Sequence, residues 1–305
     1  MAEIKDKVEN VLNEARMMLL GVTILLGFQF NAFFQNKFDD LPHELQTMKL
    51  VGLVLLLVVV GLLFGLVFFH TIVLNGNDDT KLQIYANRLI YIALLPFIVT
   101  LALDLHTGIA EYWEHERRFL YSGAFTLVGI AGWYGYGLMK DKERPLTEQK
   151  QQTMKVELKD KIKQVLTEAR LVLPGIQALL GFQFSILLME KFDKIEAMLR
   201  DMHIAALLIT LVSIVLLMAP AAYHRIVLKG ENSQGLYEFS SRMIMISATL
   251  LAVGFAMDVF IACKLVSDDN ALSGVVAGLL LIFFYALWFG YSYYKRNELK
   301  THRAS

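Results

Sequence analysis

Residues 11–30 read VLNEARMMLLGVTILLGFQF, and residues 165–184 read VLTEARLVLPGIQALLGFQF. The two stretches are 154 positions apart, and this offset holds without a gap as far as Asp104 and Asp258. It becomes 155 only near the end, where WYGYG matches WFGYS. The chain therefore contains an internal duplication. Because most apolar positions differ between the copies, the polar residues kept in both are candidates for a functional site.

The composition is that of a membrane protein. Hydrophobic residues make up 56% of the chain and charged residues only 19%, whereas soluble domains carry more charge. The mean hydropathy is +0.48. A helix needs about 20 apolar residues to cross the hydrocarbon core. Runs near this length lie at 17–34, 50–70, 89–110, 119–139, 171–190, 203–224, 243–264 and 271–294. We predict an all-α integral membrane protein with eight transmembrane helices.

A polar segment divides the two copies. It is rich in Gln and Lys, so we expect a first four-span repeat at 1–142, a cytoplasmic linker at 143–152 and a second four-span repeat at 153–305. An even number of spans makes both repeats cross the membrane in the same direction. The fold class is thus two parallel four-helix repeats, related by a pseudo-two-fold axis along the membrane normal.

A short amphipathic stretch precedes each first span. Ile4, Val8 and Leu12 share one helical face in the first copy, as Leu158 and Ile162 do in the second. Lys and Glu fill the other faces, a pattern typical of helices that lie in the membrane interface. We expect each stretch to lie along the cytoplasmic surface before the chain turns into the membrane.

The basic residues predict the orientation, because cytoplasmic loops are enriched in Lys and Arg. With both termini in the cytoplasm, only 8 of the 29 Lys and Arg residues fall on the outer side: Lys37, Lys49, Arg117, Arg118, Lys191, Lys194, Arg200 and Lys264. We predict an N-in, C-in protein of the cytoplasmic (inner) membrane.

Several classes of function are disfavoured. The net charge is zero, which gives no general attraction to nucleic acid. Cys263 is the single cysteine, so an internal disulfide and a cysteine metal cluster are excluded. The phosphate-binding, metalloprotease and serine-hydrolase motifs GxGxxG, GxxxxGK[ST], HExxH and GxSxG are absent. We predict a protein that is not an enzyme and holds no metal.

One group of duplicated polar residues falls at the cytoplasmic ends of the first three spans: Glu14, Arg16, His70 and Arg88, repeated as Glu168, Arg170, His224 and Arg242. This inner layer has two interpretations. It is an ion-pair network and a set of ordinary basic anchors, or it is a gate or a lipid-headgroup site. Since histidine titrates near physiological pH, the two histidines either sense cytoplasmic pH or form hydrogen bonds at helix ends.

A second group lies deeper. Gln29 is five residues from the outer end of its span and Asp104 is six from the end of a span running the same way, so their depths match. The second copy repeats them as Gln183 and Asp258. An amide can donate to a carboxylate, which makes each pair chemically sensible where water is scarce. An ionisable residue inside a span costs about 2.5–3.5 kcal/mol on insertion scales. Each Asp is therefore a proton or cation carrier, or a hydrated or helix-locking residue.

Haem is a further alternative. A b-type site needs two histidines at one depth on facing helices, and His70 and His224 could meet across the pseudo-two-fold axis. The chain has no CxxCH motif and no other duplicated histidine pair. We therefore predict no cofactor apart from this one haem possibility.

The second copy carries a family resemblance in LTEARLVLPGIQALLGFQF at 166–184 and MAPAAYHRIVLKG at 218–230. It resembles an uncharacterised bacterial family of four-span membrane proteins whose members are often labelled sodium:proton antiporters. The matching residues are Glu168, Arg170, Pro174, Gly175, Gln177, Gly181, Phe182, Ala219, Pro220, His224 and Arg225. The first copy departs from the pattern at Leu20, Thr23, Leu66 and Thr71. The resemblance implies a tandem fusion whose first copy has drifted.

Two functions remain open. One is a proton- or cation-coupled transporter or channel that uses the Asp/Gln pairs, with the histidines as inner gate residues. The other is a non-enzymatic accessory or scaffold subunit of a membrane complex, which binds lipid or haem. The lipid bilayer is a partner in both, and a homo-oligomer or a larger membrane complex fits either.

Overall fold

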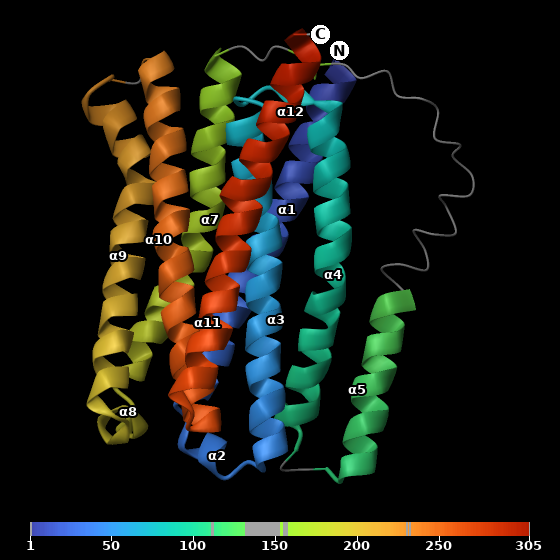
Figure 1. Ribbon diagram of the computed structural model, residues 1–305, viewed down its shortest axis with the longest axis vertical. Coiled ribbons are helices and arrows are strands. Elements are labelled where there is room, and N and C mark those ends of the chain that lie inside the picture. The colour runs from blue at the N-terminus through green and yellow to red at the C-terminus, as the bar shows by residue number, and fades with distance from the viewer. Residues whose placement is uncertain are drawn as a thin grey trace.

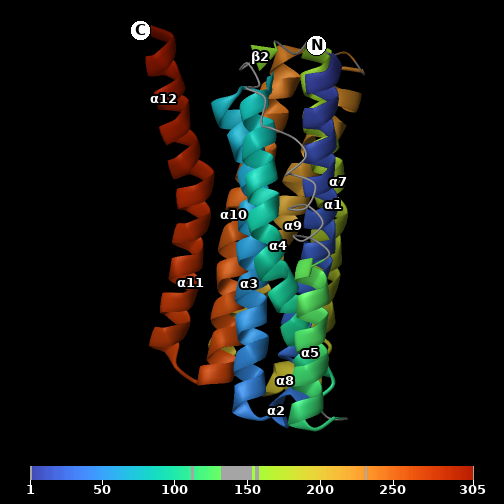
Figure 2. The ribbon, with the colours of Figure 1, turned by 90° about the vertical axis from the view of Figure 1, so that its right-hand side faces the viewer.

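The computed structural model describes residues 2–110, 113–131, 153–154, 158–229, 231 and 233–304. The molecule is an elongated bundle of roughly parallel helices (Figures 1 and 2). Both chain ends lie at one end of the bundle, which we call the terminal face; the short helices α2 and α8 lie at the other end, which we call the opposite face (Figure 1).

The two halves have corresponding elements. The first contains α1 (Ala2–Ala32), α2 (Asn36–Asp39), α3 (His43–Phe68), the π-helical turn η1 (Phe69–Val73), α4 (Thr80–Gly108) and α5 (His115–Ile130). The second contains α7 (Leu158–Ile186), α8 (Glu190–Lys194), α9 (Ala197–Ile226), α10 (Gln234–Ser267), α11 (Asn270–Tyr285), the π-helical η3 (Ala286–Tyr291) and α12 (Ser292–Ala304). The two-residue strands β1 (Asp78–Asp79) and β2 (Thr153–Met154) pair antiparallel.

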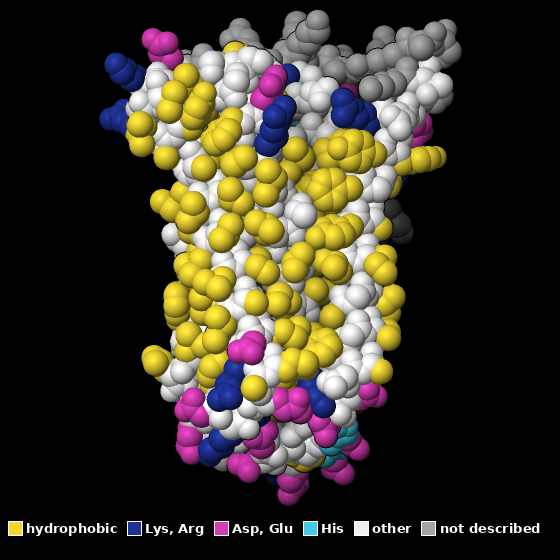
Figure 3. All heavy atoms as spheres, turned by 60° about the vertical axis from the view of Figure 1, so that its left-hand side comes forward, with side chains coloured by type: hydrophobic (Ala, Val, Ile, Leu, Met, Phe, Trp, Pro, Cys, Tyr) yellow, Lys and Arg dark blue, Asp and Glu magenta, His cyan; other side chains and the backbone are white. Residues whose placement is uncertain are grey.

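The all-α membrane class is confirmed. Within the described ranges, seven helices are long and apolar enough to span a membrane: Val8–Ala32, His43–Val73, Thr80–Gly108, Asp160–Ile186, Ala197–Ile226, Gln234–Ser267 and Asn270–Leu299. The predicted fourth span, 119–139, begins within α5, and its residues 132–139 lie outside the described residues. An apolar belt covers the middle of the bundle, and charged side chains gather at its two ends (Figure 3).

Matching caps begin the third span of each half. Asp79 accepts a hydrogen bond from the backbone N–H of Lys81 at the start of α4, and Ser233 accepts one from Leu236 at the start of α10. Short Asp and Ser side chains are favoured there because they satisfy N–H groups that have no partner within the helix. Asp79 and Ser233 are equivalent positions in the duplication, so the cap survives a change of residue.

The central contact is between α1 and α7. Along it, three residues meet their own counterparts in the other copy. The rings of Phe28 and Phe182 are 4.3 Å apart, and Asn31 Nδ2 donates to Ser185 Oγ at 2.7 Å. Gln35 Nε2 lies 3.8 Å from the sulfur of Met189. A residue touches its own copy only near a symmetry axis, so the pseudo-two-fold axis runs between these helices.

Each half is built on three mutually packed helices rather than on a closed four-helix bundle. α1, α3 and α4 pack together, as do α7, α9 and α10. The described part of the fourth helix packs on the third, α5 on α4 and α11 on α10. The second fourth span also crosses to α3, where Trp288 Nε1 donates to the carbonyl oxygen of Gly61 at 2.8 Å. A Cβ on Gly61 would lie 2.6 Å from the Phe284 ring, so glycine permits this contact.

The predicted interfacial helices do not form as separate elements. α1 and α7 each run without interruption from the amphipathic stretch into the span. In the first copy, Val8 and Leu12 are buried in one cluster with Phe69 and Leu82. The apolar stripe therefore packs against protein, and burial there replaces the expected contact with the membrane surface.

Candidate functional site: the two glutamine–aspartate pairs

Both predicted Gln–Asp pairings are present as hydrogen bonds between the first and third spans. In the first half, Gln29 Nε2 on α1 donates to Asp104 Oδ2 on α4 at 2.5 Å. In the second, Gln183 Nε2 on α7 donates to Asp258 Oδ2 on α10 at 3.1 Å. Matched depth on parallel helices therefore placed the partners correctly. The surroundings of the two carboxylates differ.

Asp104 has a cationic partner. Lys49 on α3 forms an ion pair with it, with Nζ 2.9 Å from Oδ1. The two side chains are 16% and 19% exposed. Gln29 thus occupies one carboxylate oxygen and Lys49 the other. A charge held in this way is neutralised and fully hydrogen-bonded, which offsets much of the cost of placing it inside a span.

The first pair lies close to a cavity at the opposite face. This cavity has a volume of about 500 Å³, and Lys49 and Thr107 are among its lining residues. Lys37, Asp40 and Arg118 also line it, together with apolar residues such as Phe38 and Leu45, so charged and apolar side chains share the cavity. This arrangement matches the hydrated, helix-locking interpretation of Asp104.

Asp258 has a different environment. It is buried, and its Oδ1 has no hydrogen-bond partner among the described residues; nor does Gln183 Oε1. The described ion pairs of the chain do not include Asp258. The nearest lysine along α10, Lys264, instead binds Asp268 at 2.7 Å and approaches Glu196 at 3.7 Å. Its hydrogen bond holds the pKa of the exposed Asp268 carboxyl below the ordinary value.

The position equivalent to Lys49 is His203. This histidine is fully buried, and its Nε2 lies 3.0 Å from the backbone carbonyl oxygen of Gln183. Its ring packs among three aromatic rings at centroid distances of 5.4–5.9 Å: Phe30, Phe34 and Phe192. Gln183 therefore joins His203 through its backbone and Asp258 through its side chain.

The members of the predicted inner layer that the structure describes differ in exposure. Glu14, Arg88 and Arg242 have exposed side chains, and Glu14 forms no ion pair in the part of the chain that is described. Arg16 is buried and donates to Asn13 at 2.9 Å. The side chains of two further members of the predicted layer lie outside the described residues: Glu168 and Arg170.

The two histidines of that layer lie on elements with different neighbours. His70 is buried in η1, which packs on α3 and α12. His224 is partly buried near the end of α9, which packs on α10 and α7. It lines a cavity of about 300 Å³ with Leu166, Pro220 and Arg225 among others. The two histidines thus lie on different helix pairs, one in each half, and haem binding between them stays a prediction.

Lys49 and His203 are the functional candidates that the sequence analysis missed. Identity between the two copies marks the other polar candidates, and these two residues differ in type. The signal was nevertheless present, because the constant offset aligns them and both are titratable. A titratable residue that changes type opposite a retained Asp marks a difference in charge between the copies.

The fold and the paired sites define a polytopic helical membrane protein built from two copies of one unit. Residues 3–136 and 151–292 each match the family described as "Family of unknown function (DUF6328)", and the chain belongs to this family. The two matches agree with the duplication seen in the sequence and in the α1–α7 contact. No curated protein and no solved structure matches the chain.

Proposed function

We propose that the protein moves protons across the membrane, alone or coupled to another small cation, and that Asp258 is the group that binds and releases them. The observation that carries this proposal is the contrast at one position: Lys49 neutralises Asp104, whereas His203 leaves Asp258 with an amide as its described side-chain partner.

The physical argument concerns the cost of a buried charge. An ionised carboxylate in a dry site without a cation is strongly disfavoured, and its neutral, protonated form avoids that cost. Protonation also turns one carboxyl oxygen into a hydrogen-bond donor. In Asp258 the oxygen Oδ1, which has no hydrogen-bond partner among the described residues, can hold this proton. A group that is stable only when it is protonated, or when water or a cation reaches it, is suited to carry protons.

Asp104 is the fixed counterpart in this proposal. Its charge is already balanced by Lys49, so proton binding would break an ion pair and leave a lysine unpaired. We assign it to holding α1, α3 and α4 together. Division of labour between the copies follows: the first contributes a structural ion pair, and the second contributes the exchangeable site.

Proton flux into liposomes tests the proposal. Wild-type protein should carry flux, Asp258→Asn should reduce it at least tenfold, and the matched variant Asp104→Asn should retain most of it. Equal loss in the two variants would contradict the assignment to Asp258. Absence of flux in the folded wild-type protein would contradict proton transport and would favour the accessory-subunit function instead.

We also propose that the terminal face is cytoplasmic. The uneven distribution of Lys and Arg supports this orientation, and acidic side chains gather at the opposite face in Figure 3. Single cysteines at Lys81 and at Lys194, in a Cys263→Ala background, should react with a membrane-impermeant thiol reagent from opposite sides. Labelling of position 81 from the periplasmic side of intact cells would contradict the orientation.

A further inference from the structure

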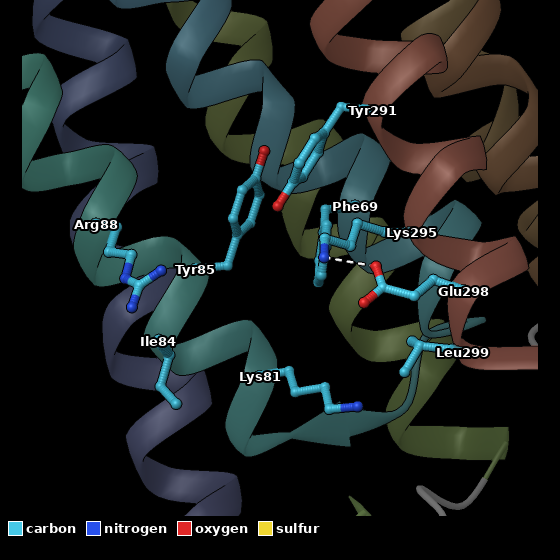
Figure 4. A pocket seen from close by; sticks show the side chains of 9 residues that line it. All are labelled: Phe69, Lys81, Ile84, Tyr85, Arg88, Tyr291, Lys295, Glu298 and Leu299. Atoms are coloured by element: carbon cyan, nitrogen blue, oxygen red, sulfur yellow. Dashed lines mark hydrogen bonds and ion pairs between the residues drawn. The ribbon is translucent and has the colours of Figure 1, made fainter. Parts of the chain in front are cut away.

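A second polar site lies near the terminal face, away from the Gln–Asp pairs. It is a cavity of about 590 Å³ between α4 and the continuous helix formed by α11, η3 and α12. Figure 4 shows the side chains that converge on it: Phe69, Lys81, Ile84, Tyr85, Arg88, Tyr291, Lys295, Glu298 and Leu299. It shares no residue with the proposed proton site.

One wall is a stack of aromatic rings. The centroids of Phe69 and Tyr85 are 4.3 Å apart, and those of Tyr85 and Tyr291 are 5.4 Å apart, with nearly parallel planes in both pairs. The phenol oxygen of Tyr85 is buried and has no hydrogen-bond partner in the described residues. A buried hydroxyl without a partner costs about 1–3 kcal/mol. A ligand that accepts its hydrogen bond would recover that energy.

Cations dominate the charge of the cavity. The cavity is lined by one carboxylate, Glu298, and by three cationic side chains: Lys81, Arg88 and Lys295. Lys295 is paired with Glu298 at 2.6 Å, whereas Lys81 and Arg88 make no ion pair within the described ranges. Two cationic side chains, at i and i+7 on one helix, are therefore available to an anion.

An apolar surface continues from this site toward the middle of the membrane. Tyr91, Ile92 and Leu95 on α4 are about half exposed, and they follow Arg88 along the helix at helical spacing. Ile84, also about half exposed, lies one turn before Arg88. The cavity lies at the end of the span, at the level of the lipid headgroups. A lipid with an anionic headgroup and apolar acyl chains would thus contact the basic residues with its headgroup and the apolar face of α4 with its chains.

The described wall of the equivalent position in the second half, on α10, differs in charge. Gly235 replaces Lys81 and the acidic Glu238 replaces Ile84, although Arg242 is kept in place of Arg88. The ring contact itself survives, because Tyr223 and Phe239 lie 4.9 Å apart where Phe69 and Tyr85 do. The aromatic packing is thus common to both copies, and the pair of cations at Lys81 and Arg88 is particular to the first.

We propose that this cavity binds the phosphate of an anionic phospholipid, with Lys81 and Arg88 pairing with the phosphate, Tyr85 donating its hydroxyl hydrogen and the acyl chains lying along α4. Basic pockets between transmembrane helices suit such headgroups, and each cation near the surface contributes about a fivefold gain in affinity. Free inorganic phosphate has the same headgroup chemistry but lacks the apolar part.

Native mass spectrometry of the purified full chain in detergent tests the site. The probes are phosphatidylglycerol, phosphatidylcholine and inorganic phosphate, each added alone. We expect the wild-type protein to prefer phosphatidylglycerol over phosphatidylcholine at least tenfold. The Lys81→Ala/Arg88→Ala variant should lose about 20-fold in phosphatidylglycerol affinity, since two cations are removed. Arg242→Ala, the matched control in the second half, should keep wild-type affinity.

Tyr85→Phe provides a second variant that preserves the ring stack and the fold. We expect it to lower phosphatidylglycerol affinity severalfold, because only the hydroxyl hydrogen bond is lost. Equal binding of the two lipids by the wild-type protein would overturn the proposal. An unchanged affinity in the folded double variant would also overturn it, as would saturable binding of inorganic phosphate without any preference for phosphatidylglycerol.

Discussion

Asp104 and Asp258 stand at equivalent positions, accept a hydrogen bond from equivalent glutamines and lie on equivalent helices. They differ in what approaches their second oxygen. Lys49 pairs with Asp104, while at Asp258 the equivalent residue, His203, bonds to a backbone carbonyl instead. The comparison shows that a duplicated site can keep its geometry and lose its electrostatic equivalence through one substitution.

The aromatic surroundings support this difference. His203 packs among rings that come from both halves, Phe30 and Phe34 on the α1 side and Phe192 from α8. Lys49 instead lines a cavity of about 500 Å³ that also contains the charged side chains of Lys37, Asp40 and Arg118. An uncompensated charge costs more free energy in a low-dielectric site, whereas water in a hydrated site screens the charge and lowers that cost. The same carboxyl group is thus stable as an anion in one copy and costly as an anion in the other.

Converting the second site into the first should have the largest effect. In His203→Lys, a lysine stands where the first copy has one, and it should pair with Asp258 as Lys49 pairs with Asp104. We expect proton flux into liposomes to fall at least tenfold, because the carboxylate would be held as an ion. His203→Gln serves as the neutral control and should retain more flux. Undiminished flux in a folded His203→Lys protein would refute the role given to this position.

Removing the lysine from the first site should cost stability rather than transport. Lys49→Met leaves Asp104 without its cation, and we expect a loss of about 1–3 kcal/mol, less than for a fully buried pair because both groups are partly exposed. Thermal or denaturant unfolding in detergent measures it. Adding Asp104→Asn should recover most of the loss, since no unpaired charge then remains. An additive double variant would show that the pair is not coupled.

The helix contact at the axis allows a smaller test of asymmetry between equivalent glycines. A Cβ on Gly27 would lie 2.3 Å from the ring of Phe182, whereas a Cβ on the equivalent Gly181 would meet nothing within 4 Å. Gly27→Ala should therefore destabilise the protein by about 1–3 kcal/mol through overpacking. Gly181→Ala should be neutral or should stabilise by up to about 1 kcal/mol, as alanine does inside helices. The same change in unfolding midpoint for both would contradict the packing.

The sequence predicted the part of the site that depends on depth. Gln29 and Asp104 lie at matched distances from the ends of parallel spans, so simple counting along the helices paired them. The membrane class likewise followed from composition and run length. Both properties depend only on the order and spacing of residues along the chain.

Other features depend on which helix faces pack against each other, which the order of residues does not reveal. Glu14 and Arg16 are two residues apart, a spacing that points side chains to different helix faces, and indeed Glu14 is exposed while Arg16 is buried. Glu14 and Arg16 therefore do not face the same side of α1, a point that matched depth alone does not reveal. The amphipathic stretch at Val8 and Leu12 has a stripe that suits a membrane surface or a protein surface equally well, and only the packing against Phe69 decides between them.

The central claim, that Asp258 exchanges a proton and Asp104 does not, is tested most directly by infrared difference spectroscopy of the protein in lipid after a change of pH. We predict a band of a protonated carboxylic acid that appears on acidification from alkaline pH in the wild-type protein and in Asp104→Asn, and that is missing in Asp258→Asn. A band that persists in Asp258→Asn and vanishes in Asp104→Asn would contradict the account.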